Sequence, residues 1–382
     1  MAGFMNGIKY FCCLFQHLLS VLMYRKILFF IFLFYSLNSI AQNENWPNPE
    51  VGQLYEQAKE YQAKGAWKEA ITQLQQAIQL APDVALLRKD LSNCYNTVGN
   101  YAAAYSTIEP LAKSEQADEY TYFITGTALM GMGEKKKAKK TYEKGLKVFP
   151  YSGMLYHELG IYFQANKDPE YAITSWVSGI EGNPTYALNY YEAAKLYAQS
   201  NQPLWALLYA EQYIQLDRHS TRSTEMRNVL FLTYTTLFNN IATMSNSAEK
   251  TPVISPDKIT FENAALEIFK QLTPVVADGI TTDNLTMLRT RFVMEWMDRY
   301  MAKFPFTLFA WQDQLLRDGQ FEAYNQWLLG KVESETLYNS WTTFNADAIP
   351  ALDAWLQKNK YNPVATDFYN SKNVKELFST KR

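Results

Sequence analysis

Cysteine and histidine are both scarce in this sequence, with three of each among 382 residues. Cys12 and Cys13 lie in an apolar leader, so Cys94 is the single cysteine of the remaining chain and an internal disulfide is excluded there. His157 and His219 have no metal-ligand spacing to each other or to Cys94. We therefore expect no metal site and no cofactor.

The motifs of common enzyme classes are also missing. The sequence contains no G-x-S-x-G nucleophile motif, no phosphate-binding G-x-x-x-x-G-K-[ST] loop and no paired-glycine nucleotide fingerprint. We predict a non-enzymatic protein without catalytic residues. A hydrolase hidden in the second half is a weak alternative, because catalytic groups meet in space and not in sequence. The net charge is −2 and no strongly basic region is present, so nucleic acid is not an expected partner.

The start of the chain has the pattern of a secretory signal peptide. A short basic start at residues 23–26 is followed by an apolar run over 27–37 and by small residues that end at Ala41. We predict a signal peptide over 1–41, with translation beginning at Met1 or Met23.

This leader sets the expected location. Its apolar run is shorter than the ~20 residues of a membrane-spanning helix. We therefore expect a cleaved signal peptide and not an uncleaved membrane anchor, and no integral membrane span in the protein after cleavage. Residues 42–50, which contain two prolines, are predicted to be a linker. The predicted location is the periplasm or another part of a bacterial cell envelope.

A period of 34 residues organises the chain after the linker. Five alanines keep this interval, namely Ala70, Ala104, Ala138, Ala172 and Ala206. Gly65, Gly99 and Gly133 keep it as well. A fixed period of this length indicates a solenoid, in which each unit buries its apolar face against its neighbours. With Val51 as the first position, five units extend over 51–220.

Residue size also follows the period. Positions four, seven, eight and eleven of a unit fall on one helix face. The eleventh position is large in every unit, with Tyr61, Tyr95, Leu129, Phe163 and Tyr197. The eighth position is small, with Ala58, Ser92, Gly126, Gly160 and Ala194. Together with the alanines at position twenty, this pattern predicts two closely packed helices in each unit.

With these positions, the stretch 51–220 resembles the tetratricopeptide repeat (TPR) proteins. The resemblance implies an all-α fold, a right-handed superhelical solenoid whose first helices line a concave groove for an extended peptide or a partner helix. The family's groove positions give these candidate peptide-binding residues: Tyr55, Lys59, Lys89, Asn93, Tyr120, Phe123, Thr127, His157, Tyr191 and Lys195. Further groove-facing positions are Gln62, Leu86, Asn96, Met154 and Ile161.

Each kind of groove residue has an expected role. The lysines are expected to pair with carboxylates of the partner, the aromatic residues to supply apolar contact, and Asn93 to bond a peptide backbone. His157 is either a contact to the peptide or simply an exposed histidine. Lys89 and Asn93 match the first pair of the clamp by which TPR domains hold the acidic tails of cytosolic chaperones. Ile124 and Glu158 occupy later clamp positions, so no such clamp is expected.

Beyond the repeats the period is lost, although helical spacing continues. Residues 221–382 are predicted to form an irregular, aromatic-rich helical domain, with Leu308–Gly330 as a decayed repeat hairpin. A helix is expected over Val332–Gln357, broken or kinked at Pro350, and another over Ala365–Thr380.

Five of the nine tryptophans belong to this second half, namely Trp296, Trp311, Trp327, Trp341 and Trp355. Aromatic residues at helical spacing mostly pack between helices, and a terminal repeat needs a cap, so packing is the first interpretation. The alternative is a glycan-binding surface, similar to the TPR-containing outer-membrane proteins that work with carbohydrate importers. Under that alternative we expect the protein to associate with the outer membrane.

The sequence as a whole predicts an exported, non-enzymatic TPR scaffold that binds a protein or peptide partner in its groove. A glycan-binding helical protein of the outer membrane is the alternative.

Overall fold

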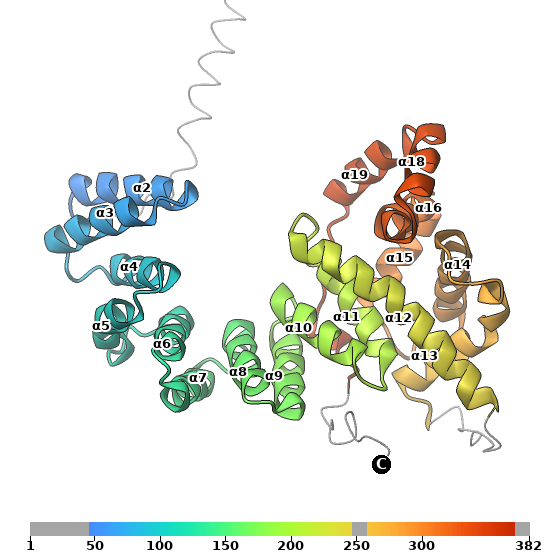
Figure 1. The fold of residues 1–382 in the computed structure, drawn as a ribbon, viewed down its shortest axis with the longest axis horizontal. Helices are drawn as coiled ribbons and strands as arrows, with labels where there is room; N and C mark the ends of the chain where they lie inside the picture. The colour runs from blue at the N-terminus through green and yellow to red at the C-terminus, as the bar shows by residue number, and fades with distance from the viewer. Residues whose placement is uncertain (1–45, 247–257, 371–382) are drawn as a thin grey trace, which may run out of the picture.

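The computed structural model describes residues 46–246 and 258–370, and in these ranges the chain is built from helices and loops without a strand (Figure 1). The predicted all-α fold is therefore confirmed. The signal peptide predicted over 1–41 lies outside the described residues. Helix α2 already begins at Pro49, inside the stretch predicted to be a linker.

The first ten described helices form five successive hairpins along an arc (Figure 1). They are α2 (Pro49–Ala63) with α3 (Trp67–Leu80), α4 (Ala85–Thr97) with α5 (Tyr101–Ala112), α6 (Glu119–Gly131) with α7 (Lys135–Val148), α8 (Gly153–Ala165) with α9 (Pro169–Gly182), and α10 (Ala187–Ala198) with α11 (Pro203–Leu216). The first helices of neighbouring hairpins also contact one another, α4 with α6, α6 with α8 and α8 with α10. These contacts place the first helices on the inner side of the arc.

The turns inside the first three hairpins depend on glycine. Gly65, Gly99 and Gly133 have φ angles of 71°, 78° and 79°, in the left-handed region where a side chain is disfavoured. At the same place in the fourth hairpin stands Lys167, with a φ of 60°. It is the one non-glycine residue with positive φ among those described. The left-handed turn is therefore repeated in the fourth hairpin, although the glycine that forms it in the first three hairpins is absent there.

The small residues of the repeat lie where paired helices touch. All five alanines at position twenty are fully buried. A Cβ added at Gly126 would stand 2.1 Å from Cε1 of Tyr142, and one at Gly160 would stand 2.2 Å from Nε1 of Trp176. Both distances are far below van der Waals contact, so only glycine fits. The predicted close packing of the two helices is confirmed in these hairpins.

After α11 the chain forms an irregular helical region that packs against the last hairpin (Figure 1). Its elements are α12 (Thr221–Asn246), α13 (Phe261–Gln271), the 3-10 turn η2 (Thr273–Val276), α14 (Thr282–Arg299), α15 (Thr307–Arg317), α16 (Phe321–Asn325), the π-helical turn η3 (Gln326–Gly330), α17 (Lys331–Glu333), α18 (Glu335–Phe344), α19 (Ala348–Lys358) and the 3-10 turn η4 (Ala365–Asp367). One continuous core joins this region to α9, α10 and α11. The earlier hairpins have smaller, separate cores.

A buried ion pair connects the last hairpin to the region after it. The carboxylate of Glu211 on α11 accepts hydrogen bonds from both terminal nitrogens of Arg289 on α14, at 2.8 and 2.6 Å. Gln312 and Tyr324 donate to the same carboxylate at 2.7 and 2.6 Å. Helices α14, α15 and α16 are thereby fixed to α11.

Two predictions for the end of the chain differ from the structure in the residues that it describes. The stretch over Val332–Gln357, predicted as a helix broken or kinked at Pro350, is instead interrupted at Ser334 and again between the end of α18 at Phe344 and the start of α19 at Ala348. Pro350 lies in the first turn of α19, where a missing N–H breaks no helical hydrogen bond. The helix predicted over Ala365–Thr380 is limited, in its described part, to the short turn η4. Residues after Asn370 lie outside the described part of the chain.

Candidate functional site on the inner helices

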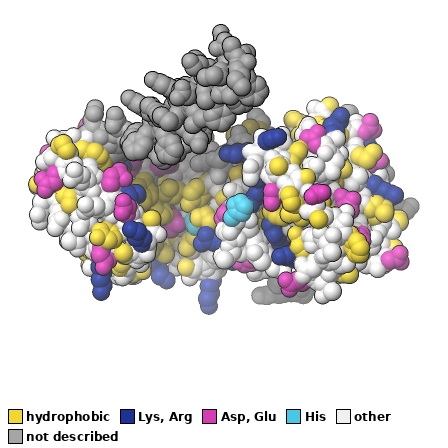
Figure 2. Space-filling model, turned by 90° about the horizontal axis from the view of Figure 1, so that it is seen from above, with side chains coloured by type: hydrophobic (Ala, Val, Ile, Leu, Met, Phe, Trp, Pro, Cys, Tyr) yellow, Lys and Arg dark blue, Asp and Glu magenta, His cyan; other side chains and the backbone are white. Residues whose placement is uncertain are grey.

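The ten predicted groove residues all belong to first helices of the hairpins, on α2, α4, α6, α8 and α10. Those on the same helix are three or four positions apart and therefore share a face. Figure 2 shows a hollow between the first hairpins and the region after the repeats, with hydrophobic, basic and acidic side chains along its visible walls. The inner helices are the candidate site.

The three predicted groove lysines each form an ion pair within the chain. Nζ of Lys59 lies 3.5 Å from Oδ2 of Asp90, and Nζ of Lys89 lies 2.8 Å from Oδ2 of Asp118. Each of these acids belongs to the following hairpin or to its entry. Lys195 similarly pairs with Glu225 of α12, at 3.3 Å. These lysines join neighbouring units, so their charge is already partly neutralised by acids of the chain.

Aromatic side chains form a second feature of the inner face. The rings of Tyr120 and Phe123 stack with centroids 5.7 Å apart, and both side chains are half-buried. Burial raises the pKa of Tyr120 to about 12, and the negative charge of Asp90 adds to this rise. Its hydroxyl therefore stays protonated at neutral pH and can donate a hydrogen bond. Tyr55 packs against Trp46 with centroids 4.9 Å apart.

Amide and hydroxyl groups lie beside this aromatic pair. Nδ2 of Asn96 donates to the carbonyl of Ile124 at 3.2 Å, while its Oδ1 is buried and has no hydrogen-bond partner. The hydroxyl of Thr127 donates to the carbonyl of Phe123 at 2.9 Å. Asn93, predicted to bond a peptide backbone, is half-buried one turn before Asn96. The inner face thus holds an unsatisfied acceptor next to an aromatic stack.

The environment of His157 differs from one of the two sequence interpretations. Its side chain is buried, and Nδ1 lies 2.9 Å from Oε1 of Glu158. Its ring meets the edge of Tyr186 at 6.0 Å. The interpretation as an exposed histidine is wrong, because the side chain is buried and its ring packs against Tyr186, the residue before α10.

Near His157 the predicted residues Tyr191 and Lys195 belong to a charged cluster, whose other members Glu192, Arg222 and Glu225 were not predicted. The hydroxyl of Tyr191 donates to Glu225, which also pairs with Lys195, and Arg222 lies over the Tyr191 ring at 5.6 Å. Burial raises the pKa of Glu192 despite nearby positive charges. Helices α10 and α12 thus share an internal network at this end of the inner helices.

A sequence signal for part of this cluster does exist. Position six of the unit is acidic in four of five repeats, with Glu56, Asp90, Glu158 and Glu192, and it is Ile124 in the third. Three of these four acids contact or face residues of the inner helices. The family's groove positions do not include position six, so the resemblance did not predict these acids as groove residues.

The tryptophans of the second half occupy different environments. Trp296 and Trp311 are buried, as the packing interpretation requires. Trp327 is half-buried, with the guanidinium of Arg227 over its ring at 4.0 Å. Trp341 and Trp355 are half-buried. Trp296 and Trp311 are therefore not available to a ligand at the surface.

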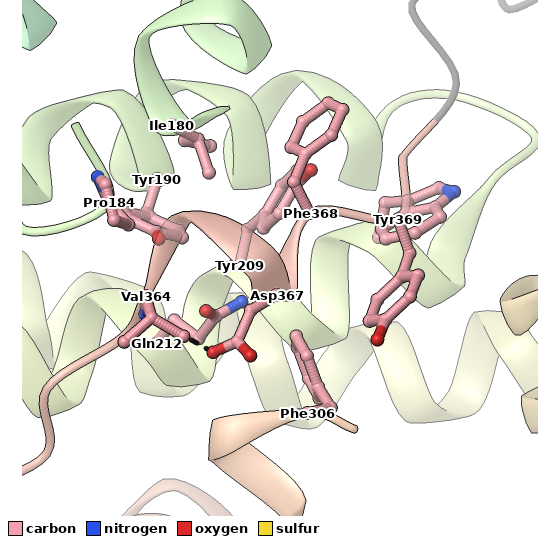
Figure 3. Close-up of a pocket in the computed structure, with 11 residues that line it drawn as sticks. Ile180, Pro184, Tyr190, Tyr209, Gln212, Phe306, Val364, Asp367, Phe368 and Tyr369 are labelled. Atoms are coloured by element: carbon pink, nitrogen blue, oxygen red, sulfur yellow. Dashed lines mark hydrogen bonds between the residues drawn. The ribbon is translucent and has the colours of Figure 1, made fainter. Parts of the chain in front are cut away.

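Two cavities in the core are too small for an organic ligand. One lies where the chain end returns to the repeats, and Figure 3 shows Asp367, Phe368 and Phe306 around it with Tyr209 and Gln212. Its volume of about 20 Å³ is close to the space of a single water molecule. The cavity beside the Glu211 pair has the same volume.

No group of three or more histidine, cysteine, aspartate or glutamate side chains suited to a metal ion gathers within 46–246 and 258–370. Among the helices of the same ranges, none combines the length and the apolar character that crossing a membrane would need.

Part of the repeat array matches a known family. The sequence model of the family described as tetratricopeptide repeat matches residues 61–122, from the end of α2 to the first turn of α6. The five hairpins have the paired-helix arrangement typical of such a solenoid. No curated protein matches the sequence.

Several solved structures of repeat proteins are similar to this chain. A thermophilic TPR protein of Thermus thermophilus is 14% identical, with 47% of this chain and 98% of that chain covered and a TM-score of 0.42. A tetratricopeptide repeat protein of Parabacteroides merdae is 13% identical, with coverage of 69% and 97% and a TM-score of 0.37. The C-terminal part of a TPR protein of Cytophaga hutchinsonii is 17% identical, with coverage of 69% and 94% and a TM-score of 0.38.

Proposed function

We propose that this protein with tetratricopeptide-type repeats is a non-enzymatic scaffold, and that it binds an extended segment of a partner protein along its inner helices. The observation that carries the proposal is the unsatisfied Oδ1 of Asn96, close to the stacked rings of Tyr120 and Phe123. An acceptor beside aromatic surface suits a peptide, which has both backbone N–H groups and apolar side chains.

The energetic argument starts from Asn96. A buried acceptor without a partner costs roughly 1–3 kcal/mol. Because Oδ1 has no exposed surface, the Asn96 side chain would have to turn toward the inner face before a backbone N–H of the partner could remove this cost. The half-buried rings of Tyr120 and Phe123 would add apolar burial, and aromatic residues commonly dominate binding energy. The protonated hydroxyl of Tyr120 supplies a donor for a backbone carbonyl.

The ion pairs of the groove lysines limit the contribution of charge. Lys59 and Lys89 already have acidic partners. A partner carboxylate that exchanges with these acids gains little, because exposed ion pairs contribute about 0.2–1 kcal/mol. Affinity should therefore depend weakly on salt, unlike binding at a clamp of unpaired lysines.

Partner capture tests this proposal. Full-length protein and the double variant Asn96→Ala with Phe123→Ala are used to capture partners from an envelope extract, followed by cross-linking and mass spectrometry. We expect the double variant to lose the partner while its circular dichroism stays helical. Lys64→Ala, which breaks only the exposed pair with Glu60, is the control that should keep it. Equal capture by all three proteins would contradict the groove.

We also propose that the protein is exported to the periplasm or cell envelope and that its leader is removed after Ala41. The basic start, the apolar run and the small residues before Gln42 support this. Amino-terminal sequencing of the protein from fractionated native cells should read from Gln42. A cytoplasmic protein that keeps the leader would contradict export.

A further inference from the structure

A pocket of about 280 Å³ opens between the start of α14, the π-helical turn η3 and α18, away from the inner face of the repeats. It is much larger than the two core cavities. At its edge Leu337 and Phe344 are 62% and 86% exposed, so apolar side chains of α18 face solvent here. Neither the repeats nor the proposed groove accounts for this pocket.

An unsatisfied hydroxyl belongs to the pocket wall. Thr282 is only 2% exposed, and its Oγ1 has no hydrogen-bond partner. Its backbone N–H is already satisfied, because it donates to Oε2 of Glu333 at 2.6 Å. Native proteins leave few buried polar groups unpaired. The Oγ1 atom has no exposed surface as the side chain stands, so a ligand hydroxyl in the pocket would reach it after rotation about the Cα–Cβ bond of Thr282.

The remaining polar groups define what such an occupant must offer. Gln326, Ser340 and Asn345 line the pocket with amide and hydroxyl groups, which both donate and accept hydrogen bonds. No lysine, arginine or histidine is among the lining residues, which argues against phosphate, sulfate or a carboxylate ligand. Ligand hydroxyls, which also donate and accept, match this set.

The two carboxylates of the pocket are already compensated. Asp283 lies in the first turn of α14 and accepts from Nε2 of Gln326 at 3.3 Å. Glu333 accepts from the backbone of Thr282 at the same helix start. A helix N-terminus stabilises negative charge, so these groups do not require a cationic ligand. They remain available as acceptors for ligand hydroxyls.

One wall of the pocket is aromatic. The indole of Trp341 is half-buried, and its Nε1 donates to Oε1 of Glu322 at 3.2 Å, which fixes the ring. A pyranose ring combines an apolar C–H face, which can lie on an aromatic ring, with a rim of hydroxyls. We propose that this pocket binds one sugar residue of a neutral glycan, with Trp341 under the ring and Thr282 hydrogen-bonded to a hydroxyl.

The test uses saturation-transfer NMR on the full-length protein with glucose, galactose, mannose, xylose and N-acetylglucosamine as probes. At least one sugar should bind the wild-type protein. Thr282→Val keeps the shape of the side chain and removes only the unpaired hydroxyl, so the protein should remain folded. The variant should bind roughly fivefold more weakly, as expected for one neutral hydrogen bond.

A second pair of variants separates the pocket from general effects of tryptophan removal. Trp341→Ala should abolish transfer to the sugar. Trp355→Ala is the matched control, because Trp355 is also half-buried, bonds Asp318 through its Nε1 and lies outside the pocket. It should bind like the wild-type protein. Absence of transfer to all five sugars, unchanged binding by Thr282→Val, or binding of methylammonium in their place would overturn the proposal.

Discussion

The side chains of Glu211 and Arg289 are 5% and 4% exposed, and each is the other's counter-charge. Burial by itself lowers the pKa of Arg289, but the charge and the hydrogen bonds of Glu211, together with Tyr234 and Tyr324, outweigh it and keep this pKa well above its ordinary value. The arginine therefore stays charged in the core. A buried charge of this kind is stable only while its partner is present.

Glu211→Gln should therefore be strongly destabilising. The amide has no charge to balance Arg289, and removal of one member of a buried pair costs about 3–5 kcal/mol. Urea unfolding of the full-length protein measures the loss. The control is Glu60→Gln, in an exposed pair with Lys64, which should change stability by less than ~1 kcal/mol. Equal effects of the two variants would show that burial of Glu211 is unimportant.

Glu192 makes stability depend on pH in a defined direction. Burial raises its pKa above the ordinary 4.5, although Lys195, His157 and Arg222 oppose the rise and Glu225 adds to it. At a pH between the ordinary pKa and the raised pKa, Glu192 keeps its proton in the folded protein but has lost it in the unfolded chain. The free energy of unfolding therefore falls as pH rises through this window.

Glu192→Gln removes this dependence because the amide does not titrate. The variant should be more stable than the wild-type protein at neutral pH, and the difference should disappear when the pH falls below the ordinary pKa of 4.5. Urea unfolding at both pH values measures the difference. A larger advantage of the variant in acid would reverse the sign and refute the explanation.

At the scale of elements, α8 and α9 approach each other through Gly160. The indole of Trp176 occupies the space where a side chain would be, and its Nε1 donates to the carbonyl of His157 at 3.2 Å. Gly160→Leu should therefore push the two helices apart and cost about 1–3 kcal/mol or more. Thermal unfolding measures the effect. Ala102→Leu on the exposed face of α5 is the control and should be nearly neutral.

The local sequence pattern does not decide where the last helices begin and end. Pro350 breaks a helix in its interior but not in its first turn, and the sequence does not say which position it has. The position is decided by the end of α18 at Phe344 and the start of α19 at Ala348, which depend on how α18 and α19 pack.

At the scale of the whole molecule, the two ends of the repeat array are supported differently. A continuous core joins α9, α10 and α11 to the helical region after them, while α2, α3 and α4 share a small separate core. Each unit of a solenoid is stabilised mainly by its neighbours, so units that lack a large neighbour open more easily.

Hydrogen exchange of the full-length protein should reveal this gradient. Backbone amides of α3 should exchange through openings of lower free energy than amides of α11 and α14. In a Glu211→Gln variant, the protection of α11 amides should fall toward that of α3 amides, because the contact between α11 and α14 is weakened. Uniform protection along the array would indicate a single cooperative unit instead.

The sequence by itself determined the helix pairs and their close contacts. Position twenty is alanine and position eight is small because two helices of one unit touch there, and these contacts join residues close in sequence. The same register placed the ten groove candidates on the first helices. The packing of Trp296 and Trp311 also followed from helical spacing.

Only the tertiary structure decided what those groove residues contact. Lys89 finds Asp118 through the stacking of one unit on the next, which period alone does not specify. Glu211 and Arg289 are 78 positions apart, and Thr282 meets Glu333 across 51 positions. Such contacts depend on how whole elements pack, and helix spacing carries no information about that packing.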